Sequence, residues 1–114
     1  MTRRRQLLGA AGEALAADWY VDHGYVVLDR NWRRREGEID LVLARRSEVV
    51  FCEVKTRTTA AFGAPVEAVT PAKQVRIRRL AAAWLKESPR HWASVRFDVA
   101  SILGPQLDVI EAAF

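Results

Sequence analysis

The sequence predicts an α/β domain in which helices flank a mixed sheet. Two segments carry apolar residues at helical spacing, and five shorter segments are rich in apolar and β-branched residues. Along the chain they follow the order α-β-β-β-α-β-β, which is typical of layered α/β domains. The 114 residues suit a single domain over residues 1–114, and we expect residues 1–6 to form a flexible basic N-terminus.

The first helix is expected from Leu8 to about His23, and Gly24 follows where a C-cap glycine would stand. Its buried face is predicted from small and apolar residues at helical spacing: Leu8, Ala11, Gly12, Leu15 and Trp19. A short apolar strand is expected over residues 25–28. The chain then enters its most basic segment, which holds Arg30, Trp32, Arg33, Arg34 and Arg35.

Two further strands are expected at residues 38–43 and 49–56. The first alternates polar and apolar residues, and the second is rich in β-branched residues. They should form a hairpin that turns at Arg46 and Ser47. Residues 58–69 have no clear period and contain glycine and proline, so we expect a long loop there.

The second helix is expected between its N-cap Thr70 and about Glu87, because Pro71 suits the first helical position. Its apolar face is predicted from four residues at helical spacing: Ile77, Leu80, Ala81 and Trp84. Two closing strands are expected at residues 95–103 and 107–110.

The strand after the turn presents one face that starts apolar and ends charged. A period of two puts four side chains on that face: Val49, Phe51, Glu53 and Lys55. With a two-residue turn, Asp40 lies opposite Glu53 and Glu38 lies opposite Lys55. Opposed carboxylates destabilise a sheet, because directly paired side chains have Cβ atoms about 4.5 to 5.5 Å apart.

A divalent cation such as Mg²⁺ would resolve this repulsion, because it prefers carboxylate oxygens. The ion would activate a water and neutralise a scissile phosphate, while Lys55 could orient that water or stabilise the developing oxyanion. The alternative is a solvated sheet face with a surface ion pair. The apolar neighbours Val49 and Phe51 favour a site, so we expect Asp40, Glu53 and Lys55 to perform metal-assisted phosphodiester hydrolysis.

The composition indicates which classes of partner and which compartment to expect. The net charge of +4 and isoelectric point near 9.8 suit a polyanion such as nucleic acid. The single cysteine, Cys52, excludes an intramolecular disulfide and favours the cytosol. No apolar run approaches the roughly 18 residues needed to cross a bilayer. We therefore expect a cytoplasmic protein without a membrane partner, and a symmetric substrate would suit a homodimer.

Four motifs follow one another along the chain: Gly12-Glu13, Gly37-Glu38-Ile39-Asp40, Glu53-Val54-Lys55-Thr56-Arg57 and Pro71-Ala72-Lys73-Gln74. In this order, and over nearly the whole chain, they resemble the small bacterial YraN family. The second and third also resemble the split Asp…Glu-x-Lys signature of restriction-endonuclease-like nucleases. The resemblance implies a restriction-endonuclease-like three-layer fold, similar to archaeal Holliday-junction resolvases.

The resemblance also implies roles for individual residues. Asp40 and Glu53 would be metal ligands, Lys55 the catalytic lysine and Glu13 a further acidic ligand, with Mg²⁺ or Mn²⁺ as the ion. Gln74 would be a further site residue. Related exonucleases carry a tyrosine four residues after this glutamine, whereas here that position is arginine. This departure does not fit an exonuclease.

We expect nucleic-acid contacts from five basic residues: Arg33, Arg34, Arg35, Arg57 and Lys73. Trp32 could stack a base or simply cap the core. Lys73 would oppose the helix dipole unless a phosphate or the carboxylate cluster lies nearby. The expected function is a metal-dependent endonuclease acting on branched or structured DNA in preference to RNA. The alternative is a nucleic-acid-binding or adaptor module that keeps this fold without turnover.

Overall fold

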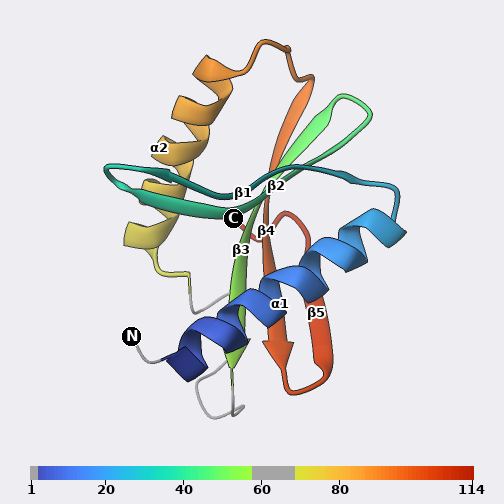
Figure 1. The fold of residues 1–114 in the computed structure, drawn as a ribbon. Coiled ribbons are helices and arrows are strands. Elements are labelled where there is room, and N and C mark those ends of the chain that lie inside the picture. The colour runs from blue at the N-terminus through green and yellow to red at the C-terminus, as the bar shows by residue number, and fades with distance from the viewer. Residues whose placement is uncertain (1–2, 58–68) are drawn as a thin grey trace.

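The computed structural model describes residues 3–57 and 69–114, and its elements follow the predicted order (Figure 1). The helices are α1 (Arg3–Asp22) and α2 (Pro71–Glu87). The strands are β1 (Val26–Arg34), β2 (Gly37–Arg45), β3 (Glu48–Arg57), β4 (Ser94–Leu103) and β5 (Gln106–Ile110). The expected loop at residues 58–69 lies outside the described residues except for Val69, which is buried.

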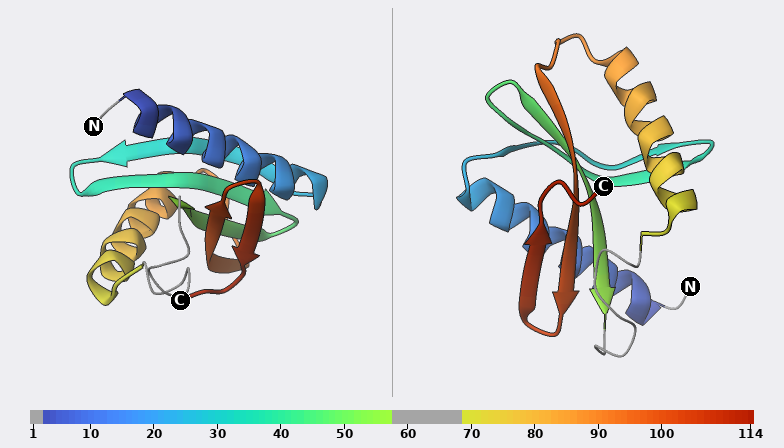
Figure 2. Two further views of the ribbon diagram at one scale, coloured as in Figure 1. Left: turned by 90° about the horizontal axis from the view of Figure 1, so that it is seen from below. Right: turned by 180° about the vertical axis from the view of Figure 1, so that it is seen from behind.

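The sheet is mixed, as predicted. Its five strands lie in the order β1-β2-β3-β4-β5, and β3 and β4 are parallel while every other pair is antiparallel. A parallel pair needs a crossover connection, and α2 lies in that connection. Figure 2 shows α1 on one side of the sheet and α2 on the other. This architecture is that of a restriction-endonuclease-like fold.

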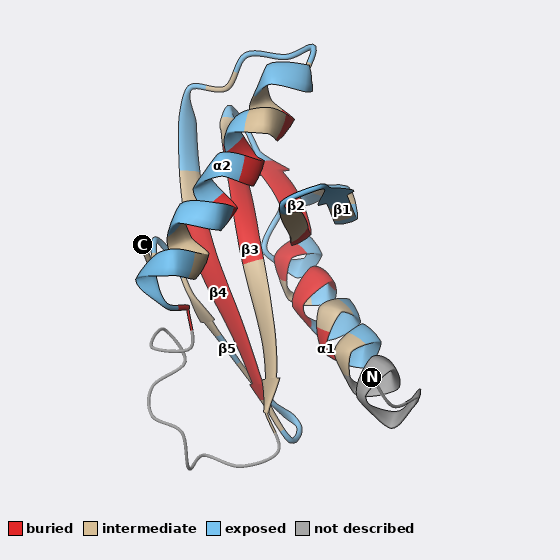
Figure 3. Cartoon of the chain, turned by 90° about the vertical axis from the view of Figure 1, so that its left-hand side faces the viewer, coloured by how far each residue is buried: buried red, intermediate tan, exposed pale blue. Residues whose placement is uncertain are grey.

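Two apolar clusters fill the spaces between the layers. The cluster under α2 includes Val49 and Phe51, and the cluster under α1 includes Val50 and Cys52. The alternation predicted for β3 is therefore confirmed. Figure 3 shows the strand buried along its first half and intermediate along its second, where Glu53 and Lys55 lie. The charged half of the strand thus emerges from the core at one end of the sheet.

The predicted buried face of α1 is wrong in part. Leu15 is 44% exposed and Ala11 is exposed, whereas the buried residues are Gly12, Ala16, Ala17 and Tyr20. The side chain of Leu8 lies outside the described residues. Small residues form the contact because the helix lies close to β3: a Cβ added at Gly12 would collide with Thr56 Oγ1. Close approach, rather than hydrophobicity, selects the face.

Strand β1 extends further than the predicted residues 25–28, through the basic segment to Arg34. Its pattern was hidden because β1 is an edge strand with a largely exposed surface, and its register shifts between Val27 and Asp29. Asn31 also has a positive φ of 50°. Trp32 packs against the core cluster under α2, so it does cap the core.

Helix α2 matches its prediction. Thr70 is the N-cap and accepts a hydrogen bond from the Lys73 backbone N–H at 3.3 Å, Pro71 opens the helix and Ser88 caps its end. The four predicted apolar residues are its buried ones. In the part of the chain that the structure describes, no helix is long and apolar enough to span a membrane.

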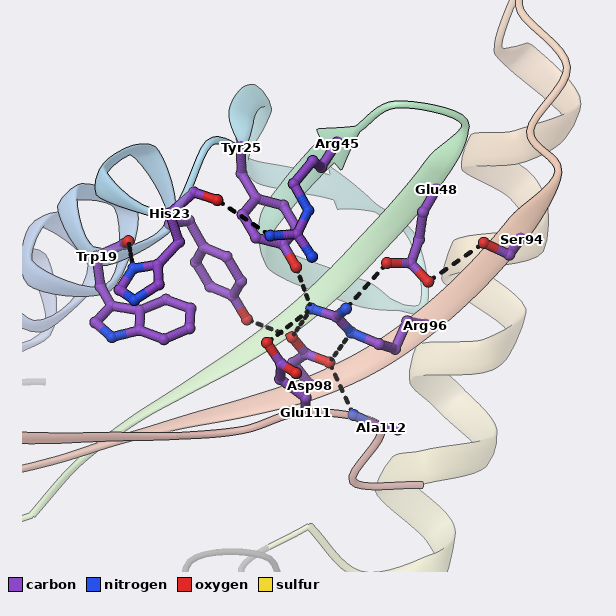
Figure 4. Close-up of polar contacts among 11 residues, drawn as sticks. Trp19, His23, Tyr25, Arg45, Glu48, Ser94, Arg96, Asp98, Glu111 and Ala112 are labelled. Atoms are coloured by element: carbon purple, nitrogen blue, oxygen red, sulfur yellow. Dashed lines mark hydrogen bonds and ion pairs between the residues drawn. The ribbon is translucent and has the colours of Figure 1, made fainter.

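A buried ion pair joins β4 to α1 and to the C-terminal residues (Figure 4). Asp98 is fully buried and accepts hydrogen bonds from the Tyr20 hydroxyl at 2.6 Å, from Arg96 Nε at 2.8 Å and from the Ala112 backbone N–H at 3.0 Å. Arg96 also donates to the Tyr25 hydroxyl and to Glu48. These hydrogen bonds satisfy a charge that would otherwise be costly to bury.

Candidate metal and nucleic-acid site

Three carboxylates gather beside the point where β2 leaves β3. Glu13 on α1 and Glu38 and Asp40 on β2 each place an oxygen within 4.8 Å of the others. The β2–β3 register runs from Arg45↔Glu48 to Leu41↔Cys52, as the two-residue turn predicts. Asp40 follows the last of these pairs. We call Glu13, Glu38 and Asp40 the acidic cluster.

The Asp40 side chain, rather than the β2 backbone, accepts a hydrogen bond from the β3 backbone where the β2–β3 pairing ends. Its Oδ2 accepts a hydrogen bond from the Val54 backbone N–H at 2.8 Å, just beyond the last β2–β3 pair. Ile39 and Val42 lie three residues apart yet belong to the same core cluster, so the alternation of β2 is interrupted between them. This interruption turns the Asp40 carboxylate toward β3, beside Glu53.

Glu13 reaches the cluster because its neighbour is glycine. Gly12 lets α1 approach Thr56 on β3 closely, and Glu13 is then half-buried between the helix and the sheet. Asn31 on β1 forms a side-chain hydrogen bond with Glu13. Asn31 lies between the pairs Arg30↔Leu41 and Trp32↔Ile39, which places it across from Asp40.

Burial and neighbouring charges raise the pKa values of Asp40 and Glu13. Burial, followed by the charge of Glu53, raises the pKa of Asp40 to about 8, while the hydrogen bond from Val54 opposes the rise. Burial also raises the pKa of Glu13, and the Asn31 hydrogen bond offsets part of that rise. Arg33 Nε lies 2.6 Å from a Glu38 oxygen and compensates one charge of the acidic cluster.

We expect Asp40→Asn to stabilise the metal-free protein at alkaline pH. A carboxyl whose pKa is raised by folding contributes stability below its unfolded pKa, near 4, and loses that contribution as the pH rises through about 8. A tenfold change in proton affinity corresponds to about 1.36 kcal/mol, and the neighbouring carboxylates share the cost, so the expected gain above pH 8 is on the order of 2 to 4 kcal/mol.

Urea unfolding in EDTA, from about pH 4 to above pH 8, measures the difference in unfolding free energy between Asp40→Asn and wild type. This difference should disappear near pH 4. Asp18→Asn removes the same charge at an exposed position of α1 and is the matched control. A gap between Asp40→Asn and wild type that stays constant with pH would contradict the assignment.

Cationic groups lie beside the carboxylates. Lys55 Nζ is 3.4 Å from Glu53 Oε1, and both side chains are largely buried. Lys73, in the first turn of α2, lies near enough that the charge of Lys55 lowers the pKa of Lys73. The Gln74 amide donates to the Val69 carbonyl at 3.0 Å, so it is bonded to the chain that enters α2.

The acidic cluster fits a small divalent cation. In octahedral Mg²⁺ coordination, with bonds of about 2.0 to 2.1 Å, two oxygens lie about 3 Å apart when they are neighbours and about 4.2 Å apart when they are opposite. The three cluster oxygens, which lie within 4.8 Å of one another, would therefore have to move closer together to share one ion. The donors are hard carboxylate oxygens, as Mg²⁺ and Mn²⁺ prefer. Glu53, which acts electrostatically on Asp40, can add a ligand from β3.

The arginines that are predicted to contact nucleic acid differ in their partners and in their exposure. Arg33 is paired with Glu38, and Arg34 NH2 lies 2.6 Å from Glu87 Oε1. Arg35 is exposed in the turn between β1 and β2. Arg57 is half-buried and donates to Ser101 Oγ at 3.5 Å. In the described part of the chain, Arg35 is therefore exposed and, unlike Arg33 and Arg34, is not held in an ion pair with a glutamate.

Glu38 and Asn31 are site residues that sequence reasoning did not assign. Glu38 was placed opposite Lys55, but it lies with Glu13 and Asp40. A signal was present, because a residue two positions from Asp40 on a strand shares its side of the sheet. Asn31 offered a weaker signal, since asparagine tolerates the positive φ that it adopts.

Comparison with known proteins identifies a family and leaves the activity open. The model of "Uncharacterised protein family UPF0102" matches residues 12–102. A UPF0102 protein of Rhodococcus opacus is 51% identical over 112 residues, covering 94% of this chain and 95% of that protein. UPF0102 proteins of Mycolicibacterium vanbaalenii and Frankia alni are each 52% identical, covering 89% and 90% of this chain and 84% and 86% of those proteins.

Proposed function

The chain belongs to the UPF0102 family, also called YraN, and we propose that it is a divalent-metal-dependent endonuclease that hydrolyses phosphodiester bonds in DNA. The observation that carries the proposal is the convergence of Glu13, Glu38 and Asp40 beside Glu53 and Lys55. They come from a helix and two strands, and each strand supplies its charged residues at the end where it leaves the core.

The cost of this convergence supports a binding role. The raised pKa values of Asp40 and Glu13 arise first from burial and then from neighbouring carboxylates, so the metal-free protein bears the cost of holding these acids together away from water. A divalent cation removes that repulsion, and it binds to the folded protein alone, so it stabilises the fold. A purely structural sheet edge gains nothing from holding these acids together.

The residues divide the chemistry between them. Asp40, Glu13, Glu38 and Glu53 would hold the ion, which when bound lowers the pKa of a water and offsets phosphate charge. Lys55, fixed beside Glu53, presents a positive charge that stabilises negative charge developing on the phosphate oxygens. Backbone N–H groups at the start of α2 attract the same phosphate.

Cleavage of branched DNA tests the function. Wild-type protein with Mg²⁺ or Mn²⁺ should cut labelled four-way junctions, flaps or single strands, and EDTA should stop the reaction. Asp40→Asn should abolish cleavage, while Asp18→Asn should retain it. Salt-dependent DNA binding without cleavage by the wild type would contradict the nuclease and favour the binding or adaptor module.

A further inference from the structure

Two adjoining pockets lie at the C-terminal end of α2, away from the acidic cluster. They have volumes of about 180 and 220 Å³, and both are lined by Asp29, Trp84, Ser88 and Pro89. Trp32 and Glu87 also line the first pocket, while Trp92 and Arg90 also line the second. We call this continuous hollow the tryptophan groove, after Trp32, Trp84 and Trp92.

The groove is aromatic inside and charged at its rim. Trp84 Nε1 donates to Asp29 Oδ2 at 2.7 Å, which fixes the buried ring. The guanidinium of Arg34 lies 4.1 Å from the Trp32 ring centroid, and that of Arg90 lies 4.1 Å from the Trp92 centroid. Glu87 is paired with Arg34, and both of these side chains are well exposed.

The groove and the acidic cluster flank the same β1–β2 hairpin. Arg33 is paired with Glu38 of the acidic cluster, and the next residue, Arg34, is paired with Glu87 of the groove. In Figures 1 and 2 the tip of this hairpin lies beside α2, whereas α1 lies on the other side of the sheet. A strand of nucleic acid that crosses the exposed turn at Arg35 can therefore reach both.

We propose that the tryptophan groove binds an unpaired nucleobase that carries an amino group, in the DNA strand on which the acidic cluster acts. The inference rests on the proposed nuclease function and specifies its substrate as DNA with unpaired nucleotides beside the scissile phosphate. Unpaired bases stack on aromatic rings and on guanidinium planes. The guanidinium groups of Arg34 and Arg90 already lie over the Trp32 and Trp92 rings, so the groove offers the outer faces of these two guanidinium planes. Arg34 and Arg90 also suit the flanking phosphates.

The carboxylates give the groove a preference among bases. A carboxylate accepts hydrogen bonds at about four lone-pair positions, and Trp84 uses one of those on Asp29. Asp29 and Glu87 can therefore accept from the exocyclic amines of cytosine, adenine and guanine, whereas thymine has no exocyclic amine and presents a carbonyl oxygen instead. Two acceptors among aromatic rings thus favour cytosine or adenine over thymine.

Binding measured in EDTA tests the groove without requiring cleavage. Fluorescently labelled short oligonucleotides of deoxycytidine, deoxyadenosine or thymidine are titrated with protein, alongside a blunt duplex. We expect cytosine and adenine strands to bind about tenfold more tightly than thymine strands or the duplex. Trp32→Leu should weaken binding to the cytosine strand by about tenfold.

Trp19→Leu is the matched control, because Trp19 lies on α1, on the other side of the sheet, and stacks on His23 just after that helix. It should change affinity by no more than about twofold. Glu87→Gln alters an exposed rim residue, so it does not depend on repacking the core, and it should reduce the preference for cytosine over thymine.

Equal binding of duplex and single strands, unchanged by Trp32→Leu, would overturn the inference even if the protein cuts DNA. Thymine strands bound as tightly as cytosine strands would overturn the role of the carboxylates. The nuclease proposal fails separately, if the protein does not cleave DNA in Mg²⁺. In that case, binding that still depends on Trp32 would continue to support the groove.

Discussion

Lys55→Ala is expected to reduce DNA cleavage by about 10²- to 10³-fold, as removal of one preorganised electrostatic group does in other enzymes. Lys55 lies 3.4 Å from Glu53 and is largely buried, so its charge acts where water screens it poorly. Metal binding should be as tight as in wild type or tighter, because the variant removes a cation from beside the carboxylates. Single-turnover cleavage and Mn²⁺ titration measure the two quantities.

Lys86→Ala is the control for Lys55→Ala, since Lys86 is exposed in the last turn of α2. It should cleave at nearly the wild-type rate. If Lys55→Ala cleaves as fast as Lys86→Ala, then Lys55 is only a partner of Glu53 in a surface ion pair and the assigned role is wrong.

Asp98→Ala is expected to destabilise the fold by roughly 3 to 5 kcal/mol, the usual cost of removing one partner from a buried ion pair. Arg96 would lose both hydrogen bonds that it donates to Asp98, at 2.8 and 2.9 Å. Tyr20 and the Ala112 backbone would each lose an acceptor as well. Because Tyr20 belongs to α1, the packing of this helix on the sheet should loosen.

Glu111→Ala provides the comparison, because Glu111 contacts the same arginine at 3.6 Å but its side chain is 51% exposed. An exposed pair contributes about 0 to 1 kcal/mol, so this variant should unfold at nearly the wild-type urea midpoint. Similar urea midpoints for the two variants would show that burial of Asp98 does not make the Arg96–Asp98 ion pair more stabilising than an exposed one.

The parts of the fold that follow from local rules were predictable. Thr70 and Pro71 mark the start of α2 by capping chemistry, and its buried residues follow from helical periodicity. The two-residue turn set the β2–β3 register, which is confirmed from Arg45↔Glu48 to Leu41↔Cys52, and Asp40 follows the last of these pairs. These features depend on residues close together in sequence, so the sequence alone contains enough information.

The features that depend on distant packing were not predictable. Leu15 fits an apolar face of α1, but the close approach of this helix to Thr56 buries smaller residues instead. The break in the alternation of β2 beside Asp40 is also not visible in the strand's sequence pattern, and it becomes apparent only from the packing of Ile39 and Val42 in one core cluster. The tryptophan groove likewise combines residues from β1 and the end of α2.

Calorimetric titration of Mn²⁺ into the protein tests most directly whether the carboxylates form a metal site. We expect saturable binding that is lost in Asp40→Asn and retained in Asp18→Asn, since only Asp40 faces Glu13, Glu38 and Glu53. Absence of saturable heat at millimolar Mn²⁺, in wild-type protein shown to be folded by circular dichroism, would contradict the metal site.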